Sequence, residues 1–208
     1  LLLGLLTLAF TVYLIPGLWG APLKILSGVT PPMNYSESPY GVGYKKLGSG
    51  SSSNDEFPED AYLGPNDIVM FKDYDKGMKY AKKKDLPVLL DFTGLVCANC
   101  RKMEERVWSE PQVLGKLKND VVLISLYVDV KDELPEDEQY TSKTTGKRIR
   151  TVGNKWSDFQ IEHYGVNAQP YYILLDHEEN MLNKPVAYTP DVEEYAAWLQ
   201  EGIDKFKN

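Results

Sequence analysis

The chain has 208 residues, of which 43% are hydrophobic and 25% are charged, a composition typical of a packed domain rather than a disordered chain or a repeat fibre. Lys and Arg number 23 against 30 Asp and Glu, and the net charge of -7 argues against binding to a nucleic-acid backbone. Two cysteines and two histidines are too few for an all-cysteine zinc site or a scaffold of several disulfides. We therefore expect one domain, with no nucleic acid and no metal bound.

The first 23 residues carry no charged side chain, since the first one is Lys24. As a helix they would extend about 34 Å, enough to cross a hydrocarbon core of about 30 Å. We predict a transmembrane helix over 1–26, interpreted as the end of a longer membrane domain because the chain opens on Leu1. A cleaved signal peptide would need a basic start and small residues before the cut, and a buried core helix would be apolar on one face only.

The segment from Ser27 to Asp60 has a different composition, because 16 of its 34 residues are Ser, Gly or Pro. Its apolar residues are too sparse to offset the entropy cost of ordering. We predict a flexible linker over 27–60 and a globular domain over 61–208.

Short apolar runs alternate with helical patterns through the globular part. Residues 88–92 form a nearly unbroken apolar run, as expected of a central parallel strand. The order of elements predicts an α/β fold with a mixed central sheet, which starts parallel, ends in an antiparallel hairpin and has helices on both faces. The predicted elements in chain order are a strand over 68–71, a helix after Asp73, a strand over 88–92, helices after Cys97 and from Pro111 to Lys118, a strand over 121–128, a polar insert over 131–153 with a turn at 144–147, a helix from Asn154 to Tyr164, strands over 171–175 and 181–188, and a helix after Asp191.

Cys97 and Cys100 are separated by two residues and lie where a helix is predicted to begin after a buried strand. Unpaired backbone N–H groups and the dipole at a helix start favour a thiolate, and can lower a thiol pKa from about 8.5 to roughly 3.5–7.5. Cys97 is then the predicted nucleophile, and Cys100, one turn further on, can resolve the mixed disulfide. The alternatives are a structural disulfide, which would stabilise little over so short a loop, and half of a metal site without its second pair.

Three segments carry a resemblance to a known family: PVLLDFTG from Pro87, CANCRKME from Cys97 and GVNAQP from Gly165. In this order they resemble the thioredoxin superfamily, and more closely the C-terminal soluble domain of DsbD-type thiol:disulfide interchange proteins, over residues 66 to 205. The insert over 131–153 is longer than the corresponding connection of a minimal thioredoxin. The resemblance implies a thioredoxin-like fold and a protein-disulfide reductase.

The same resemblance implies partners and a location. Electrons would pass from a membrane-embedded thiol transporter domain, upstream in the same protein, to periplasmic disulfide-bearing proteins. The soluble domain would face the periplasm at the bacterial inner membrane, held there by the N-terminal helix. No cofactor is implied beyond the redox-active disulfide of Cys97 and Cys100, because the electrons arrive as thiols.

Two carboxyl groups are implied to act on the cysteine protons. Asp91 lies six residues before Cys97, the position of the buried thioredoxin carboxylate, where it would take or give the proton of Cys100. The alternative is a buried Asp satisfied by backbone N–H groups. Glu104, one turn after Cys100, would raise the thiol pKa values by its charge, or would instead be an exposed Glu paired with a Lys or Arg.

Four further residues are implied to bind substrate. Pro170 would be preceded by a cis peptide bond facing the cysteines, and the backbone of Gln169 would pair with substrate peptides. Ala98 and Asn99 lie between the cysteines, where Asn99 can alter the reduction potential. A non-catalytic binding module and a disulfide oxidase or isomerase remain the alternative functions.

Overall fold

The computed structural model describes residues 2–15, 57–58 and 60–207. Near the N-terminus, α1 (Leu2–Leu14) is a helix of 13 residues. In the described ranges no helix is both long enough and apolar enough to cross a membrane. The predicted transmembrane helix beyond Ile15 and nearly all of the predicted linker over 27–60 lie outside the described residues, so both stay predictions.

The domain is organised around one five-stranded sheet, in the order β1-β2-β4-β3-β7. The three inner strands are parallel, and each edge strand is antiparallel to its neighbour, so the predicted mixed α/β sheet is confirmed. The first edge strand was not predicted, because three residues are too few to show alternation. The strands are β1 (Ala61–Leu63), β2 (Val69–Phe71), β3 (Val88–Thr93), β4 (Val122–Tyr127) and β7 (Tyr171–Leu175).

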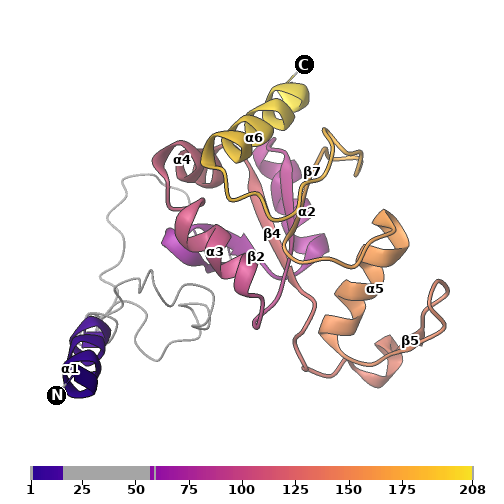
Figure 1. Ribbon diagram of the computed structural model, residues 1–208. Helices are drawn as coiled ribbons and strands as arrows, with labels where there is room; N and C mark the ends of the chain where they lie inside the picture. Colours follow the sequence, from indigo (N-terminus) through magenta and orange to yellow (C-terminus); the bar gives the residue numbers. More distant parts are fainter. Residues whose placement is uncertain (1, 16–56, 59, 208) are drawn as a thin grey trace.

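Helices cover both faces of the sheet, as predicted (Figure 1). Successive side chains of a strand point to opposite faces, so Leu89 packs with Met103 and Leu199, whereas Leu90 packs with Trp156 in a second core. The first core lies under α3, α4 and α6, and the second under α2 and α5. The helices are α2 (Tyr74–Lys84), α3 (Ala98–Arg106), α4 (Pro111–Asn119), α5 (Val152–Tyr164) and α6 (Val192–Lys207), with short 3-10 turns at η4 (Pro65–Asp67) and η5 (Glu136–Glu138).

Local capping residues explain where α2 and α5 begin and end. The Asp73 side chain accepts a hydrogen bond of 2.9 Å from the backbone N–H of Lys76, which confirms the predicted cap of α2. The predicted cap of α5 was wrong: Thr151 caps the helix and accepts from the N–H of Asn154 at 3.2 Å. Gly165 ends α5 with φ of 70°, a conformation that glycine adopts without steric cost.

The predicted strand over 181–188 was also wrong. The segment meets β7 only through isolated bridges, from Met181 to Leu175 and from Val186 to Tyr172. These partners are three residues apart on β7 but five apart on the other segment, so two residues bulge out between them. Pro185 lies in the bulge and has no N–H to donate, which prevents a regular ladder there.

The predicted polar insert forms a small hairpin beside α5. β5 (Tyr140–Thr141) pairs with β6 (Arg148–Ile149), and Gly146 at φ of 70° lies in the turn, as predicted. The Tyr140 hydroxyl donates to the buried Asp158 carboxylate at 2.9 Å, which fastens the hairpin to α5. The insert follows β4. It therefore begins near the carboxyl ends of the parallel strands β3 and β4, where the chain also continues from β3 to Cys97.

Candidate active site

The cysteine pair lies at the start of α3, directly after the central strand β3. Cys97 is the N-cap residue, and its sulfur accepts a hydrogen bond of 3.2 Å from the backbone N–H of Cys100. The two cysteines form a disulfide with their Cα atoms 5.3 Å apart. Cys97 is partly exposed, whereas Cys100 is only 1% exposed. Of the two sulfur-bearing residues, only Cys97 is therefore accessible from outside, and the predicted roles of nucleophile and resolving cysteine stay predictions.

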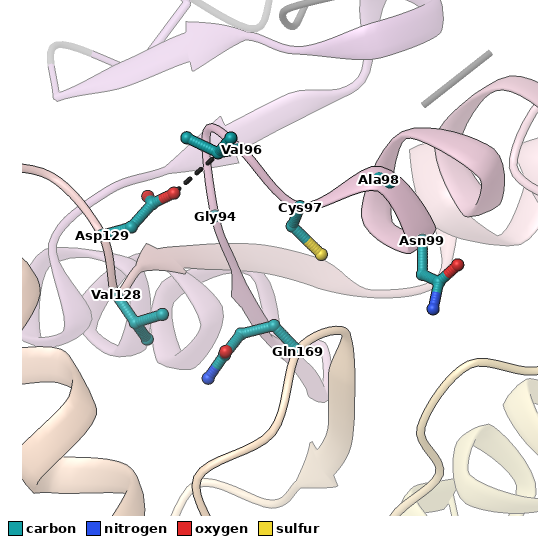
Figure 2. A pocket seen from close by; sticks show the side chains of 8 residues that line it. All are labelled: Gly94, Val96, Cys97, Ala98, Asn99, Val128, Asp129 and Gln169. Atoms are coloured by element: carbon teal, nitrogen blue, oxygen red, sulfur yellow. Dashed lines mark hydrogen bonds between the residues drawn. The ribbon is translucent and has the colours of Figure 1, made fainter. Parts of the chain in front are cut away.

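An open cavity of about 360 Å³ lies beside Cys97 (Figure 2). Three of the four predicted substrate contacts, Ala98, Asn99 and Gln169, line this cavity together with Cys97. The fourth, Pro170, is buried, and the peptide bond before it is cis, as the resemblance implied. Val96, at the rim, is 91% exposed and offers an apolar contact surface. The cavity walls are Gly94, Val96, Cys97, Ala98, Asn99, Val128, Asp129 and Gln169.

Gln160 on α5 fixes the loop that carries Gln169, a role that sequence reasoning missed. Its fully buried side chain donates to the carbonyl of Ala168 at 3.0 Å and accepts from the N–H of Ala168 at 3.3 Å. Its oxygen also accepts from the side-chain amide of Gln169 at 3.2 Å, and that amide donates to Asn167 at 3.1 Å. The buried side-chain amide of Gln160 therefore fixes the position of the loop that carries Gln169 beside Cys97.

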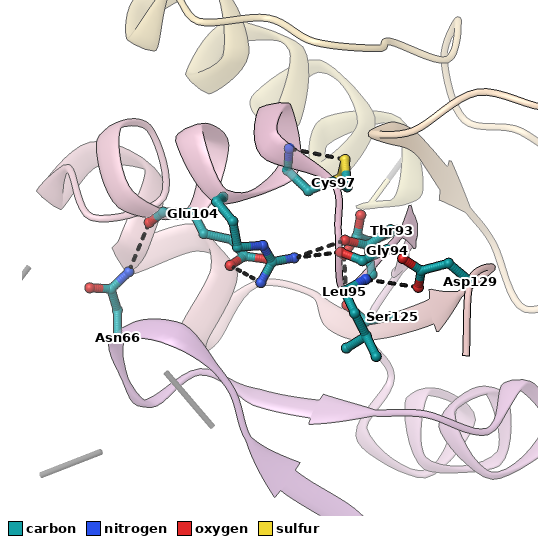
Figure 3. A network of polar contacts seen from close by, with 11 residues as sticks. Asn66, Thr93, Gly94, Leu95, Cys97, Glu104, Ser125 and Asp129 are labelled. Atoms are coloured by element: carbon teal, nitrogen blue, oxygen red, sulfur yellow. Dashed lines mark hydrogen bonds and ion pairs between the residues drawn. A yellow bond between two sulfur atoms is a disulfide. The ribbon is translucent and has the colours of Figure 1, made fainter. Parts of the chain in front are cut away.

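Asp129 fixes the turn that precedes Cys97, and it too was missed. It follows β4, and its two carboxylate oxygens accept the backbone N–H groups of Val96 at 2.9 Å (Figure 2) and of Leu95 at 2.8 Å (Figure 3). A Cβ atom on Gly94 would lie 2.9 Å from one of those oxygens, so glycine is required for this close approach. An acidic residue just past a buried strand was the one signal that could have drawn notice to Asp129.

Asp91, the predicted proton carrier, is 1% exposed on β3. It shares its face of the sheet with Leu89 and hence lies beneath α3. The Ser125 hydroxyl donates to one carboxyl oxygen at 2.7 Å, so the expected alternative of backbone N–H partners is not what the fold provides. Burial raises the pKa of Asp91 to about 7, and the Ser125 hydrogen bond and the Arg101 charge oppose that rise. The carboxyl thus changes protonation near neutral pH, as acid–base chemistry at a thiol requires.

Glu104 is paired with Arg101, as in the second predicted alternative, but the exposure expected there was wrong, because Glu104 is buried. Its predicted effect on the thiol pKa values stays a prediction. Its carboxylate lies 2.6 Å from the guanidinium of Arg101, and the exposed fractions of the two residues are 5% and 2%. Arg101 also donates to the Thr93 hydroxyl at 3.2 Å and to the Gly94 carbonyl at 3.3 Å (Figure 3). Burial raises the pKa of Glu104, and the Arg101 charge opposes that rise. The position of Arg101 after Cys100 in the family motif does not by itself reveal this role.

Comparison with known proteins places this geometry in a family. The thioredoxin-like domain family matches residues 74–203, more than half of the chain, so the chain belongs to that family. All the site residues described above lie within this range, and the fold is that of a thioredoxin-like disulfide oxidoreductase with its cysteine pair. A comparison with curated proteins found no match.

Solved structures that are similar to this chain include an oxidoreductase, a thioredoxin and a DsbD domain. A DsbH oxidoreductase has a TM-score of 0.47 at 17% identity, with 63% of this chain and 81% of that chain covered. A thioredoxin from Thermus thermophilus has a TM-score of 0.44 at 19% identity, with 62% and 82% covered. The C-terminal domain of Neisseria meningitidis DsbD in its reduced form has a TM-score of 0.42 at 15% identity, with 62% and 92% covered.

Proposed function

We propose that this domain is a protein-disulfide reductase that passes two electrons from its cysteine pair to the disulfide of a partner protein. The observation that carries the proposal is the asymmetry of the pair: Cys97 is partly exposed at the N-terminus of α3, and Cys100 is buried behind it. The cavity beside Cys97 would receive the partner's chain. No metal, flavin or nucleotide takes part, because thiols carry the electrons.

The reaction has two displacements. In the first, the Cys97 thiolate attacks one sulfur of the partner's disulfide, so that a mixed disulfide forms and one partner thiolate leaves. In the second, the Cys100 sulfur attacks Cys97, the Cys97–Cys100 disulfide forms, and the second partner thiolate leaves. The partner's disulfide gains two electrons and the cysteine pair loses two.

Asp91 would manage the proton of Cys100 during the second displacement. A neutral thiol is a poor nucleophile, so the Cys100 proton has to leave before or as its sulfur attacks. The buried Asp91 carboxylate, with a pKa of about 7, can accept that proton and return it when the pair is next reduced. Ala98, Asn99 and the backbone of Gln169 would hold the partner's chain beside Cys97.

Cysteine variants test the order of attack. In a dithiothreitol-coupled insulin reduction assay, we expect Cys97→Ser to abolish exchange, because the accessible nucleophile is gone. When reduced Cys100→Ser is freed of dithiothreitol and then mixed with insulin, it should accumulate mixed disulfides that a non-reducing gel separates. Full exchange by Cys97→Ser would refute the assignment of the nucleophile, and absence of exchange in the wild type would favour a non-catalytic binding module.

The direction of electron flow is tested by the reduction potential of the pair in a glutathione or dithiothreitol buffer. A value near the thioredoxin potential of about −270 mV supports a reductase, whereas one near about −120 mV would make the domain an oxidase. An intermediate value near about −180 mV would favour an isomerase.

The proposal extends to a DsbD-type relay at the bacterial inner membrane. The N-terminal apolar segment would hold the domain at the periplasmic face, where a membrane-embedded thiol transporter in the same protein would reduce it and periplasmic disulfide proteins would receive its electrons. Support comes from the 23 uncharged residues that precede Lys24. Expression in a bacterium, followed by carbonate extraction and protease treatment of spheroplasts, tests this placement. Release by carbonate, or protection of the domain from protease, would overturn it.

A further inference from the structure

Arg101 is the one buried cation among the described residues, and it contacts the end of β3 before Cys97 and the buried acid Glu104. One of its nitrogens lies 2.6 Å from the Glu104 carboxylate. Another donates to the Thr93 hydroxyl and to the Gly94 carbonyl, at the end of β3 where the chain turns toward Cys97. A fully desolvated ion pair of this kind is costly to form, so a functional reason for it is a hypothesis to test.

We propose that Arg101 is a positioning residue of the thiol–disulfide exchange: its buried ion pair with Glu104 opposes the protonation that burial favours at that carboxyl, and so leaves Asp91 as the carboxyl that exchanges a proton with Cys100. The inference rests on the proposed function and adds to it one residue that acts through Glu104 and Asp91. Arg101 is buried, and its side-chain partners are Thr93, Gly94 and Glu104 rather than a sulfur atom.

The argument is one of charge balance in a space that excludes water. A buried carboxyl without a partner keeps its proton, because burial penalises the charged form. Two buried carboxyls, Asp91 and Glu104, share the single cation Arg101, which can neutralise only one of them. The Arg101 guanidinium lies against Glu104, whereas Asp91 has the Ser125 hydroxyl as its hydrogen-bond partner.

The other ionisable groups around Asp91 leave this balance unchanged. Those that interact with it electrostatically from the surrounding elements are tyrosines, and burial raises the pKa of each hydroxyl, so all of them stay neutral through the pH range of interest. They are Tyr62 on β1, Tyr127 on β4, Tyr172 on β7 and Tyr195 on α6.

The geometry also explains why an arginine suits this position. The planar guanidinium can bind a carboxylate on one side while it donates to two oxygens on another, which an ammonium group cannot do with fixed orientation. The backbone of Glu104 is held as well, because its carbonyl accepts a hydrogen bond of 3.2 Å from the Asn66 side chain (Figure 3). The pair is therefore fixed to β3, α3 and the turn η4.

The decisive variant is Glu104→Gln, which keeps the shape of the side chain but leaves the Arg101 charge without its partner. The unpaired cation should then stabilise the ionised form of Asp91. We expect the midpoint of the Asp91 titration, followed by the carbonyl-carbon NMR shift of its carboxyl group in the oxidised protein, to fall by about one pH unit or more. The pH at which Cys100 resolves a mixed disulfide should fall with it.

Two further variants separate charge from packing. Adding Arg101→Met to Glu104→Gln removes the unpaired cation, so the Asp91 midpoint should rise again toward the wild-type value. Arg101→Lys keeps the charge beside Glu104 and should leave the Asp91 midpoint close to the wild-type value. Glu110→Gln, at an exposed carboxylate that caps nothing through its side chain, is the matched control and should change neither property.

The outcomes distinguish this inference from the proposed function. An unchanged Asp91 midpoint in Glu104→Gln overturns the role of Arg101 even when the wild type reduces insulin. Absence of exchange by the wild type overturns the proposed function instead, whatever the titrations show. Poor folding of the double variant leaves the single variant Glu104→Gln to decide.

Discussion

The Ser125 hydroxyl donates a hydrogen bond of 2.7 Å to one carboxyl oxygen of Asp91, across the neighbouring parallel strands β3 and β4. The other oxygen of Asp91 is buried with no hydrogen-bond partner among the described residues. A buried polar atom left in this state costs free energy that the fold has to offset elsewhere. The fold therefore retains Asp91 at the expense of stability, which is expected of a group kept for its chemistry.

Replacing Asp91 tests this cost through the pH dependence of stability. The folded pKa of about 7 lies above the model value of 3.8, so between about pH 4 and pH 7 the folded state binds a proton that the unfolded state has lost. Stability should therefore fall as the pH rises through this window, and Asp91→Asn should lack that fall. Above pH 7 we expect the variant to be more stable by on the order of 4 kcal/mol, and below pH 4 the advantage should vanish.

Urea denaturation of the oxidised proteins at pH 3.5, 5.5 and 8 measures this difference. Asp137→Asn, at an exposed carboxylate in η5, is the control and should follow the wild type at every pH. A constant difference between Asp91→Asn and the wild type across the three pH values would contradict the prediction.

Gly94 offers a test of the turn before Cys97. In Gly94→Ala the new Cβ would lie 2.9 Å from an Asp129 oxygen, so the carboxylate has to move away from the N–H groups of Leu95 and Val96. Hydrogen bonds to a charged group contribute about 1.5–3 kcal/mol each, and we expect a loss of about 2 kcal/mol in unfolding free energy. Insulin reduction should slow several-fold, because the turn sets the position of Cys97.

Gly115 in α4 is the matched control for that substitution. A Cβ there meets nothing within 4 Å, and alanine favours a helix interior by up to about 1 kcal/mol over glycine. Gly115→Ala should therefore stabilise the fold slightly and leave insulin reduction unchanged. Equal effects of the two substitutions would show that the contact with Asp129 is irrelevant.

Gln169 and the cis bond before Pro170 were implied by the family resemblance, whereas the other parts of the site that were predicted are set by neighbours along the chain. The start of α3 at the cysteines follows from local patterns, and the place of Asp91 on the central strand follows from its spacing to Cys97. Asp129 and Gln160 could not be inferred in this way, because they act on loops 33 and 8 residues distant in sequence. Their roles depend on which strand lies beside β3 and on where α5 packs.

The same limit explains the errors in the fold. The apolar residues of 181–188 indicated a strand, yet a proline and two surplus residues reduce the pairing with β7 to two bridges. The pairing of Glu104 illustrates the point at a single side chain. Its helical spacing to Arg101 was readable, but its burial was not, since that depends on the sheet beneath α3.

Gln160 allows the binding of a partner's chain to be separated from the chemistry of the cysteines. Its side chain forms hydrogen bonds with the backbone N–H and carbonyl of Ala168 and with the side chain of Gln169. None of these hydrogen bonds involves a sulfur atom. Gln160→Leu keeps the volume and removes all three hydrogen bonds. The loop beside Cys97 should then be held less firmly, and KM for a protein disulfide should rise roughly tenfold, equivalent to about 1.4 kcal/mol.

The reaction with a small aromatic disulfide, which needs no pairing with the Gln169 backbone, should stay at the wild-type rate, and so should the reduction potential. Glu162→Gln, exposed on the same helix, is the control and should leave both substrates unaffected. Steady-state kinetics with insulin and with the small disulfide measure the contrast. An equal loss on both substrates would mean that Gln160 supports the fold of the whole site rather than the loop that receives the partner.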